Sequence, residues 1–293
     1  MPSLKALRKR IRTVVNTQQI TKAMKAVSVS KLRRVQQSME NTRRYADALA
    51  SITGHLLQAS SDSEHPLQRI TESPKKIAVV LMTADRGMCG AYNNHILHKA
   101  KAYIEEVGVD KVELVCVGKK GRDFARKQGW TIVAEHLELQ GKVQAQLMAE
   151  VTDEMVQRFL AGEIDRVMII YNSFINMMRY EQKAVEFLPL DPAELLGDDE
   201  GDEAAGAGDM IFEPDAETVF GVVLERYLRV RMVTCQADAL TSEHSARMVA
   251  MSNATDNCDE LKETVTLALN KARQAAITKE LLEIVSGAEA LKG

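Results

Sequence analysis

The residues best placed to do chemistry lie in a turn at positions 83–94, TADRGMCGAYNN. The turn follows an apolar run of strand length and precedes a helical pattern, which is where phosphate-binding loops occur in α/β proteins. Its polar groups are those of Asp85, Cys89, Asn93 and Asn94. The turn has neither the GxGxxG pattern nor the GK[ST] of a P-loop. A tight strand-to-helix turn without a ligand is therefore the favoured interpretation, and a phosphate site is the alternative.

The other candidates for chemistry are weaker. His95 and His98 are three residues apart on one predicted helix, but a single such pair is a poor metal signal. The four cysteines are widely spaced without a CxxC, which favours reduced, mostly buried thiols over a zinc site or a disulfide framework. We therefore predict no catalytic residue, no cofactor-binding residue, no cofactor and no metal ligand.

Charge is strongly segregated along the chain. Residues 1–53 contain 12 Lys or Arg against two acidic residues, whereas residues 191–217 contain 11 Asp or Glu and no basic residue. The basic end could bind nucleic acid, but its cations surround the helix and no aromatic residues alternate with them for base stacking. A rod that is solvated or binds protein is favoured, and a nucleic-acid-binding coiled coil is the alternative.

Both ends of the chain are long stretches without the two residues that stop helices. Neither glycine nor proline occurs between Pro2 and Gly54, or between Gly221 and Gly287. These stretches predict helices over about residues 3–56 and 214–286. We expect the two helices to pack antiparallel as a left-handed coiled coil, with Ile11 or Val14 against an alanine-rich stripe at 261–275.

The apolar seam of the first helix is interrupted. Leu4, Leu7, Ile11 and Val14 follow a heptad register that resumes at Leu32, but Gln18, Thr21, Lys25 and Ser28 occupy the same register between them. In that stretch Ile20, Met24 and Val27 form a displaced apolar stripe. The pattern predicts a break in register that turns the contact face, so that the partner helix is absent there or another protein contacts the rod.

The middle of the chain alternates strands with helices, which predicts an open parallel α/β (Rossmann-like) sheet. Strands are expected at 76–83, 112–118, 130–136, 165–174 and 183–190, and helices at 93–107, 118–129 and 142–160. The acidic segment after them is expected to be a disordered or mobile loop. The predicted domains are an N-terminal shaft helix (1–56), an α/β foot (74–190), an acidic loop (191–213) and a C-terminal shaft helix (214–291).

Membrane and export signals are weak. The longest apolar run is Ile77 to Met82, far below the roughly 20 residues of a membrane span. The basic N-terminus has no apolar signal-like core behind it. A cytosolic or organelle-matrix protein is expected.

Four separated motifs resemble one known family, the gamma subunit of F-type ATP synthases. They are NTQQITKAMKAVSVSKLRR (16–34), DRGMCGAYN (85–93), SEHSARMVAMSNATDN (242–257) and NKARQAAITKELLEIVSGAEAL (270–291). In the last, the family's terminal pattern is filled by Ile277, Thr278, Glu280, Glu283, Gly287 and Ala288. The resemblance covers the whole chain and keeps the order of its elements.

The resemblance implies a non-catalytic rotor shaft of a proton- or sodium-translocating ATP synthase, in one copy per complex. The terminal helices would turn inside a ring of alpha and beta subunits, and the α/β foot would sit with epsilon on the membrane ring of c subunits. It also implies a peripheral location at the cytoplasmic face of a bacterial inner membrane. The implied contacts with the catalytic ring are Met24, Lys25, Arg247, Arg273, Gln274, Thr278 and Glu280, and the implied apolar bearing tip is Ile277, Leu281, Leu282, Ile284 and Val285.

One feature departs from part of the family, and one alternative function remains open. The acidic insertion lacks the paired cysteines of the chloroplast redox-regulatory segment, so thiol switching and a plastid origin are not expected. An α/β enzyme with coiled-coil arms, using the 83–94 turn as a phosphate site, remains the alternative function. Specific nucleotide binding by the isolated chain would favour that enzyme.

Overall fold

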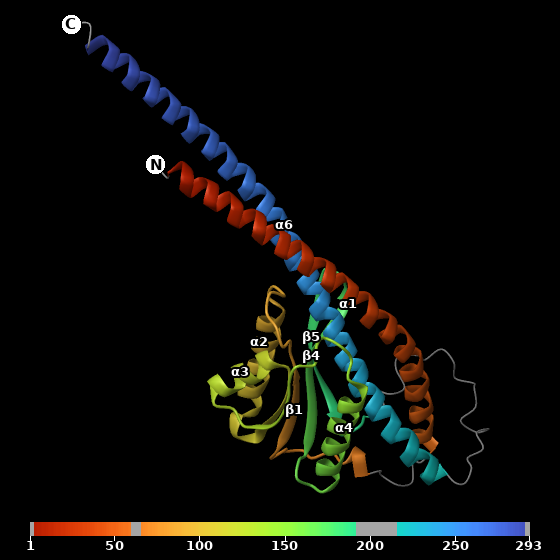
Figure 1. Ribbon diagram of the computed structural model, residues 1–293. Helices are drawn as coiled ribbons and strands as arrows, with labels where there is room; N and C mark the ends of the chain where they lie inside the picture. Colours follow the sequence, from red (N-terminus) through yellow and green to blue (C-terminus); the bar gives the residue numbers. More distant parts are fainter. Residues whose placement is uncertain (1–2, 60–65, 192–215, 291–293) are drawn as a thin grey trace. The chain divides into compact units, whose positions relative to one another are not determined.

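The computed structural model describes residues 3–59, 66–191 and 216–290 (Figure 1). All but the first residue of the acidic loop expected at 191–213 thus lies outside the described residues. The chain divides into two compact units, Met1–Ser28 with Met248–Gly293, and Val29–Arg247. We call them the helix-pair unit and the α/β unit. The division cuts through both long helices, so it does not follow the domain boundaries that the sequence predicts.

The two long helices are present. Helix α1 covers Leu4–Ala59 and helix α6 covers Ala216–Ala290, close to the predicted ranges of 3–56 and 214–286. Long helices are stable only when tertiary packing covers an apolar face. Each helix has such packing in both units, against the sheet in one and against the other long helix in the other.

The α/β unit is built on a five-stranded sheet of order β3-β2-β1-β4-β5. Each strand overlaps a range in which the sequence pattern predicts a strand. The strands are β1 (Ile77–Met82), β2 (Val112–Val117), β3 (Ile132–His136), β4 (Arg166–Asn176) and β5 (Arg179–Leu188). The helices are α2 (Tyr92–Val107), α3 (Lys119–Gln128) and α4 (Ala145–Leu160), with short 3₁₀ turns η1 (Pro66–Gln68) and η2 (Val109–Lys111).

The predicted parallel sheet is confirmed for β1 to β4, but β5 pairs antiparallel with β4. The reason lies in the connection. Only Met177 and Met178 separate the two strands, and a two-residue loop can only make a hairpin, whereas a parallel crossover needs a dozen residues or more. The sheet is therefore mixed, with an antiparallel edge strand.

Both faces of the sheet are covered. Alternate residues of the central strands pack in one core with α2 and α3, including Val79, Leu114 and Ile96. The opposite residues pack in a second core with α4 and with segments of α1 and α6, including Val80, Phe159 and Leu228. Figure 1 shows α2 and α3 on one side of the strands and α4 on the other. The sheet-proximal parts of the long helices thus belong to the core of the α/β unit.

One close approach between a strand and a helix requires glycine. Gly118 lies between β2 and α3 with φ +106°, and a Cβ there would be 2.1 Å from the Thr83 carbonyl oxygen. The Thr83 hydroxyl then accepts the Gly121 N–H at 2.8 Å. The two glycines let the start of α3 rest directly on the end of β1.

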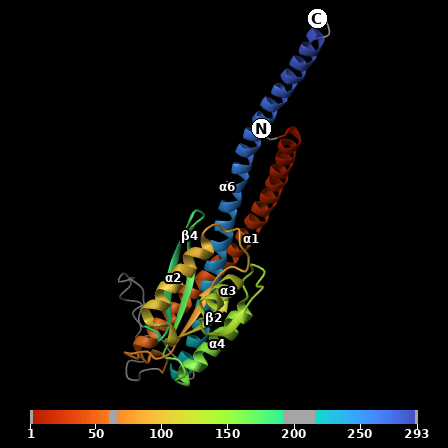
Figure 2. The same cartoon turned by 90° about the vertical axis from the view of Figure 1, so that its left-hand side faces the viewer.

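In the helix-pair unit, α1 and α6 run antiparallel. The hydroxyls of Thr21 and Thr255 are 2.8 Å apart, and Lys25 Nζ donates to Ser252 Oγ at 3.0 Å. In these two bonded pairs the residue number rises along α1 and falls along α6. The predicted antiparallel pairing is therefore confirmed between these segments of one chain. The helices lie side by side in both views (Figure 1, Figure 2).

The predicted break in register is wrong. Gln18, Thr21 and Ser28 are buried, like Leu7 and Val14 before them, and the exposed Lys25 still bonds Ser252 of α6, so the heptad seam continues unrotated through the polar stretch. Hydroxyl groups can occupy the seam because they are satisfied there: Thr21 bonds Thr255, and Ser28 Oγ donates to the Met24 carbonyl at 2.8 Å. The displaced stripe instead faces away from α6 and stays largely exposed.

Helix α6 extends past the beginning of α1. The two bonded pairs place Leu4, the first residue of α1, opposite about residue 272 of α6 at the antiparallel coiled-coil register. Figure 2 shows the end of α6 continuing beyond the end of α1. The alanine-rich stripe accordingly holds only in part: Val265 is buried and Ala272 half-buried, but Leu261, Ala268 and Ala275 are exposed.

A disulfide can test this pairing. In a chain with Cys258→Ser, the variant Thr21→Cys/Thr255→Cys should form a bond within one chain, because the two hydroxyl oxygens already lie 2.8 Å apart. Non-reducing electrophoresis should show a monomer of altered mobility. The control pair Thr13→Cys/Thr255→Cys should not crosslink, because Thr13 lies about 12 Å further along α1. Crosslinked dimers from the first pair would contradict the intramolecular register.

Candidate partner-binding surfaces

The 83–94 turn is occupied by its own chain. The carboxylate of Asp85 accepts the Lys119 N–H at 3.0 Å and the Leu139 N–H at 2.9 Å. Backbone and side-chain oxygens at positions 83 and 84 accept the next two N–H groups of α3. These donors are the first N–H groups of α3, so an anion at the start of that helix would compete with the turn for them. The polar groups of the turn thus cap α3 and bind a neighbouring loop, which favours the interpretation of a structural turn.

The remaining polar groups of the turn hold its shape. The Asn93 side chain accepts the Ala84 N–H at 3.1 Å and donates to Cys89 Sγ at 3.2 Å. Burial raises the pKa of the Cys89 thiol. Asn94 is exposed. Cys89 is a free buried thiol, as are Cys116 and Cys235, while the free Cys258 is half-buried, in line with the prediction of reduced, mostly buried thiols.

Helix α6 lies across the carboxyl end of β4, beside the strand-order reversal at β1 and β4 where open α/β sheets bind ligands. Tyr92 donates its hydroxyl to the Ala239 carbonyl at 2.9 Å, and Ser173 Oγ donates to Asp238 at 2.9 Å. Burial raises the pKa of Tyr92 well above its ordinary value, so the hydroxyl stays a donor. The switch point serves to anchor α6 rather than to expose a ligand crevice.

The histidine pair does not make a metal site in the described part of the chain, where no cluster of three possible ligands is found. His95 Nδ1 lies 3.3 Å from the Tyr180 hydroxyl, and His98 is exposed on α2. The rings of His95, Tyr180 and Tyr92 pack along the β5 side of α2. Their contacts are those of a packed surface.

The α6 end, residues 273–288, is the most exposed apolar segment of the helix-pair unit. The predicted tip residues are half to two-thirds exposed: Ile277, Leu281, Leu282, Ile284 and Val285. The predicted polar contacts Arg273, Gln274, Thr278 and Glu280 are exposed as well. Only Thr278 has a recorded internal bond, from its hydroxyl to the Gln274 carbonyl at 3.0 Å, so the polar heads are open to a partner. A single helix without a cover cannot bury this surface itself.

A second exposed stripe follows the outer face of α1. Ile20 and Val27 are 60% and 57% exposed, and Met24 between them is half-buried. Lys25 is exposed, with its ammonium held by Ser252. We call Ile20, Met24 and Val27 the α1 stripe. The sequence reveals these residues, but only the structure shows that they face outward while the polar seam is buried.

Arg247 is placed differently from the other predicted contacts. Its side chain, 11% exposed, forms a 2.6 Å ion pair with Glu243 and donates to the carbonyls of Arg86 and Gly87. It therefore ties α6 to the 83–94 turn within the α/β unit. We keep the proposal of partner contact for the other six residues and assign Arg247 to this internal joint.

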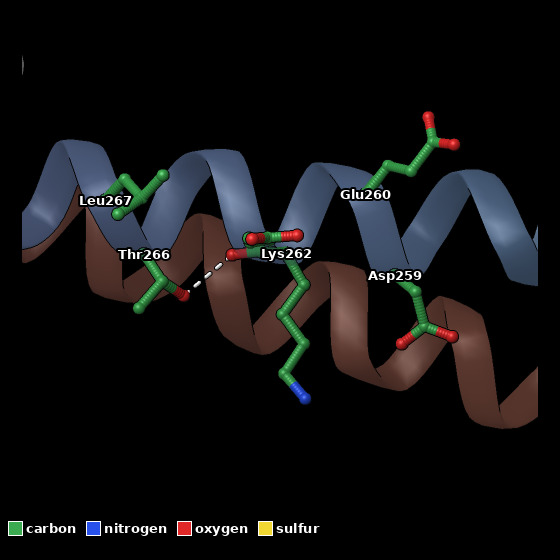
Figure 3. A pocket seen from close by; sticks show the side chains of 6 residues that line it. Asp259, Glu260, Lys262, Thr266 and Leu267 are labelled. Atoms are coloured by element: carbon green, nitrogen blue, oxygen red, sulfur yellow. Dashed lines mark hydrogen bonds between the residues drawn. The ribbon is translucent and has the colours of Figure 1, made fainter.

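A shallow hollow of about 440 Å³ lies on α6 in the helix-pair unit, lined by Asp259, Glu260, Lys262, Glu263, Thr266 and Leu267. Figure 3 shows its charged side chains pointing apart rather than converging. The dashed line marks a hydrogen bond within α6, which Thr266 Oγ1 donates to the Lys262 carbonyl one turn earlier at 2.7 Å. The hollow has the features of a solvated helix face.

The described helices include none that is long and apolar enough to cross a membrane. The described residues form a paired-helix unit with an exposed apolar end and an α/β unit whose switch point is filled by α6. Exposed apolar segments of this kind are typical of a subunit in an assembly. Comparison with known proteins gives the same class.

The family model described as ATP synthase matches residues 3–291. The chain is 39% identical over 292 residues to the ATP synthase gamma chain of Pelotomaculum thermopropionicum, covering 100% of both chains. It is 41% identical to that of Symbiobacterium thermophilum, covering 99% of this chain and 98% of the relative. The chain belongs to the gamma-chain family of ATP synthase, and so to the central stalk of that complex.

Solved structures agree. The central stalk and c-ring structure of Tetrahymena thermophila mitochondrial ATP synthase matches with TM-score 0.61 and 26% identity, over 80% of this chain and 99% of that one. A chain of the Euglena gracilis mitochondrial ATP synthase matches with TM-score 0.68 and 22% identity, over 98% of this chain and 94% of that one. The second likeness establishes the fold alone.

Proposed function

We propose that this chain is the rotor shaft that couples ion flow through a membrane ring to ATP synthesis or hydrolysis in the catalytic ring. The observation that carries the proposal is the α6 end, a single helix that no other described segment of the chain covers. Its apolar and polar residues are exposed together. A sleeve of apolar residues from the alpha and beta subunits would cover it. Catalysis would then belong to beta, with none in this chain.

Asymmetry supports the same mechanism. The helix-pair unit has an apolar α6 end and a basic α1. The sequences of these segments contain no internal repeat that would give the shaft two-fold or three-fold symmetry. A shaft of this kind presents a different surface to each catalytic subunit around it. It can therefore hold chemically identical sites in different states, because each site contacts a different set of side chains.

The α/β unit would form the foot, in contact with epsilon and with the ring of c subunits. The Tetrahymena relative comes from a structure of central stalk and c-ring, which supports this placement. This chain would be peripheral at the cytoplasmic face of a bacterial coupling membrane, as part of the complex and in one copy per complex. The coupled ion would be a proton or a sodium ion.

Copurification tests the proposal. An affinity tag on this chain, expressed in its native cell and extracted in mild detergent, should recover alpha, beta, epsilon and the c subunits together. Tagged chain that is recovered alone, or with nucleotide bound in the α/β unit, would favour the enzyme alternative. The filled switch point predicts that the isolated chain binds no nucleotide specifically.

A further inference from the structure

A polar cluster joins two loops of the α/β unit to both long helices. His244 of α6 lies 3.1 Å through Nε2 from the Gly141 carbonyl, in the loop before α4, and 3.4 Å through Nδ1 from Arg247 Nη1. Lys31 of α1 donates to the neighbouring Gln140 carbonyl at 2.7 Å. Arg247 reaches the Gly87 carbonyl in the turn after β1. Through these groups, α1 and α6 hold both loops at the carboxyl end of the sheet.

The packing around the imidazole is tight. Gly141 has φ +64°, and a Cβ on it would lie 2.8 Å from His244 Cε1 and 3.0 Å from Nε2. The His244 side chain is 1% exposed. The loop thus approaches the ring closely enough that only glycine fits, which fixes the carbonyl oxygen against Nε2.

The two partners determine which form of His244 fits. A carbonyl oxygen only accepts, so Nε2 must carry the proton that it donates to Gly141. A guanidinium only donates, so Nδ1 must be unprotonated to accept from Arg247. The neutral ring with its proton on Nε2 satisfies both. A protonated ring would point Nδ1–H at the Arg247 cation and lose that bond.

The surrounding charges favour the neutral form. Burial lowers the pKa of His244, and the nearby cations of Arg247 and Lys31 lower it further, against the opposing effect of Glu243 and of the bond to Gly141. Two further cations lie near Lys31 from the adjacent loops, Arg86 and Lys142. Since the folded pKa is depressed, the stabilisation is present above the ordinary pKa of about 6.5 and is lost as pH falls through the folded value.

We propose that His244 is a pH-sensitive latch. When neutral, it fastens the 139–143 loop to α6 and holds the Arg247 side chain in place, and when protonated, it releases both. The latch is a positioning device within the α/β unit, and the proposal does not rest on the function proposed above. Acidification would loosen the loops at the carboxyl end of the sheet before the chain unfolds. No other described histidine has both an arginine and a backbone carbonyl as recorded ring partners.

Hydrogen exchange on the full-length chain tests the latch. Protection of amides at 139–143 should fall about tenfold between about pH 7.5 and about pH 5.5, after correction for intrinsic exchange, as expected for one buried hydrogen bond lost. His244→Gln keeps a donor for the Gly141 carbonyl but cannot titrate in this range. Its protection should be independent of pH and near the wild-type value at the higher pH.

Two further variants complete the test. His244→Leu removes both bonds and should show the low protection at both pH values. His136→Gln replaces another histidine whose pKa burial lowers, and should retain the wild-type pH dependence. If His244→Leu does not fold, the glutamine variant decides alone. A pH dependence in His244→Gln equal to that of the wild type, or none in the wild type, would overturn the latch.

Discussion

Replacing Met24 by lysine is expected to leave the isolated chain folded while ion pumping weakens in the assembled synthase and ATP hydrolysis continues. Met24 is half-buried and belongs to the α1 stripe, whose neighbours Ile20 and Val27 face away from α6. A lysine there can extend its ammonium into solvent along the helix surface. We therefore expect a change in melting temperature of no more than about 2 °C, which corresponds to a change of about 0.5 kcal/mol in the free energy of unfolding.

The functional effect comes from a new charge. We propose that this part of α1 faces an acidic loop of beta, as the resemblance to the gamma subunits implies. One additional ion pair of about 1 kcal/mol in a single rotational state would slow escape from that state about fivefold. Hydrolysis can continue past such a trap under load-free conditions, but transmission of torque to the membrane ring would suffer.

The measurement pairs thermal unfolding of the isolated chain with ATP-driven pumping in reconstituted vesicles. Met24→Leu is the matched control, because it keeps an apolar side chain of similar size and should pump like the wild type. If Met24→Lys lowers the melting temperature and reduces hydrolysis and pumping in equal proportion, Met24 only packs in the shaft, and its coupling role is wrong.

The second large effect is expected at the α6 end. Replacing Arg273 and Gln274 together by alanine should leave the unfolding temperature unchanged, because both side chains are exposed and alanine is the best helix former. In the assembled complex we expect coupled turnover to fall at least about tenfold, since a hydrogen bond to a charged group contributes about 1.5–3 kcal/mol. Steady-state ATP turnover of the purified complex checks this.

Lys279→Ala is the control for that substitution. Lys279 is in the same segment and 78% exposed, and its only recorded partner is Glu283 one turn away at 3.6 Å. Loss of such an exposed pair should change turnover little. Equal loss in both variants would mean that the α6 end tolerates no change at all, and unchanged turnover in the double variant would remove Arg273 and Gln274 from the proposed contacts.

Much of the fold could be predicted because its signals are local. The absence of glycine and proline predicts α1 and α6 to within a few residues, and the apolar run at 76–83 predicts β1. The direction of β5 could have been found from the short Asn176–Arg179 connection, which only a hairpin can use. The sequence pattern predicts that the strand starts at Lys183, several residues later than it does, and this late start hides the short connection.

The seam of α1 shows why the rest could not be predicted. From residue type alone, Ile20 and Val27 would be expected to be buried and Thr21 and Ser28 exposed. In the structure Thr21 and Ser28 are buried, and Ile20 and Val27 are exposed. The bond between Thr21 and Thr255 depends on a partner 234 residues away, which no local pattern contains. Similarly, Arg247 matches a family motif, but its ion pair with Glu243 and its bonds to the turn after β1 appear only once the loops are placed.

Rotation of the α/β unit tests the central proposal most directly. The four native cysteines are buried or half-buried, so in a Cys258→Ser background a Lys99→Cys substitution on the exposed face of α2 gives one reactive thiol for a visible probe. With the catalytic ring fixed to a surface, we expect the probe to turn steadily in one direction while ATP is hydrolysed. A probe that stays fixed during continuing ATP turnover would contradict the rotor shaft.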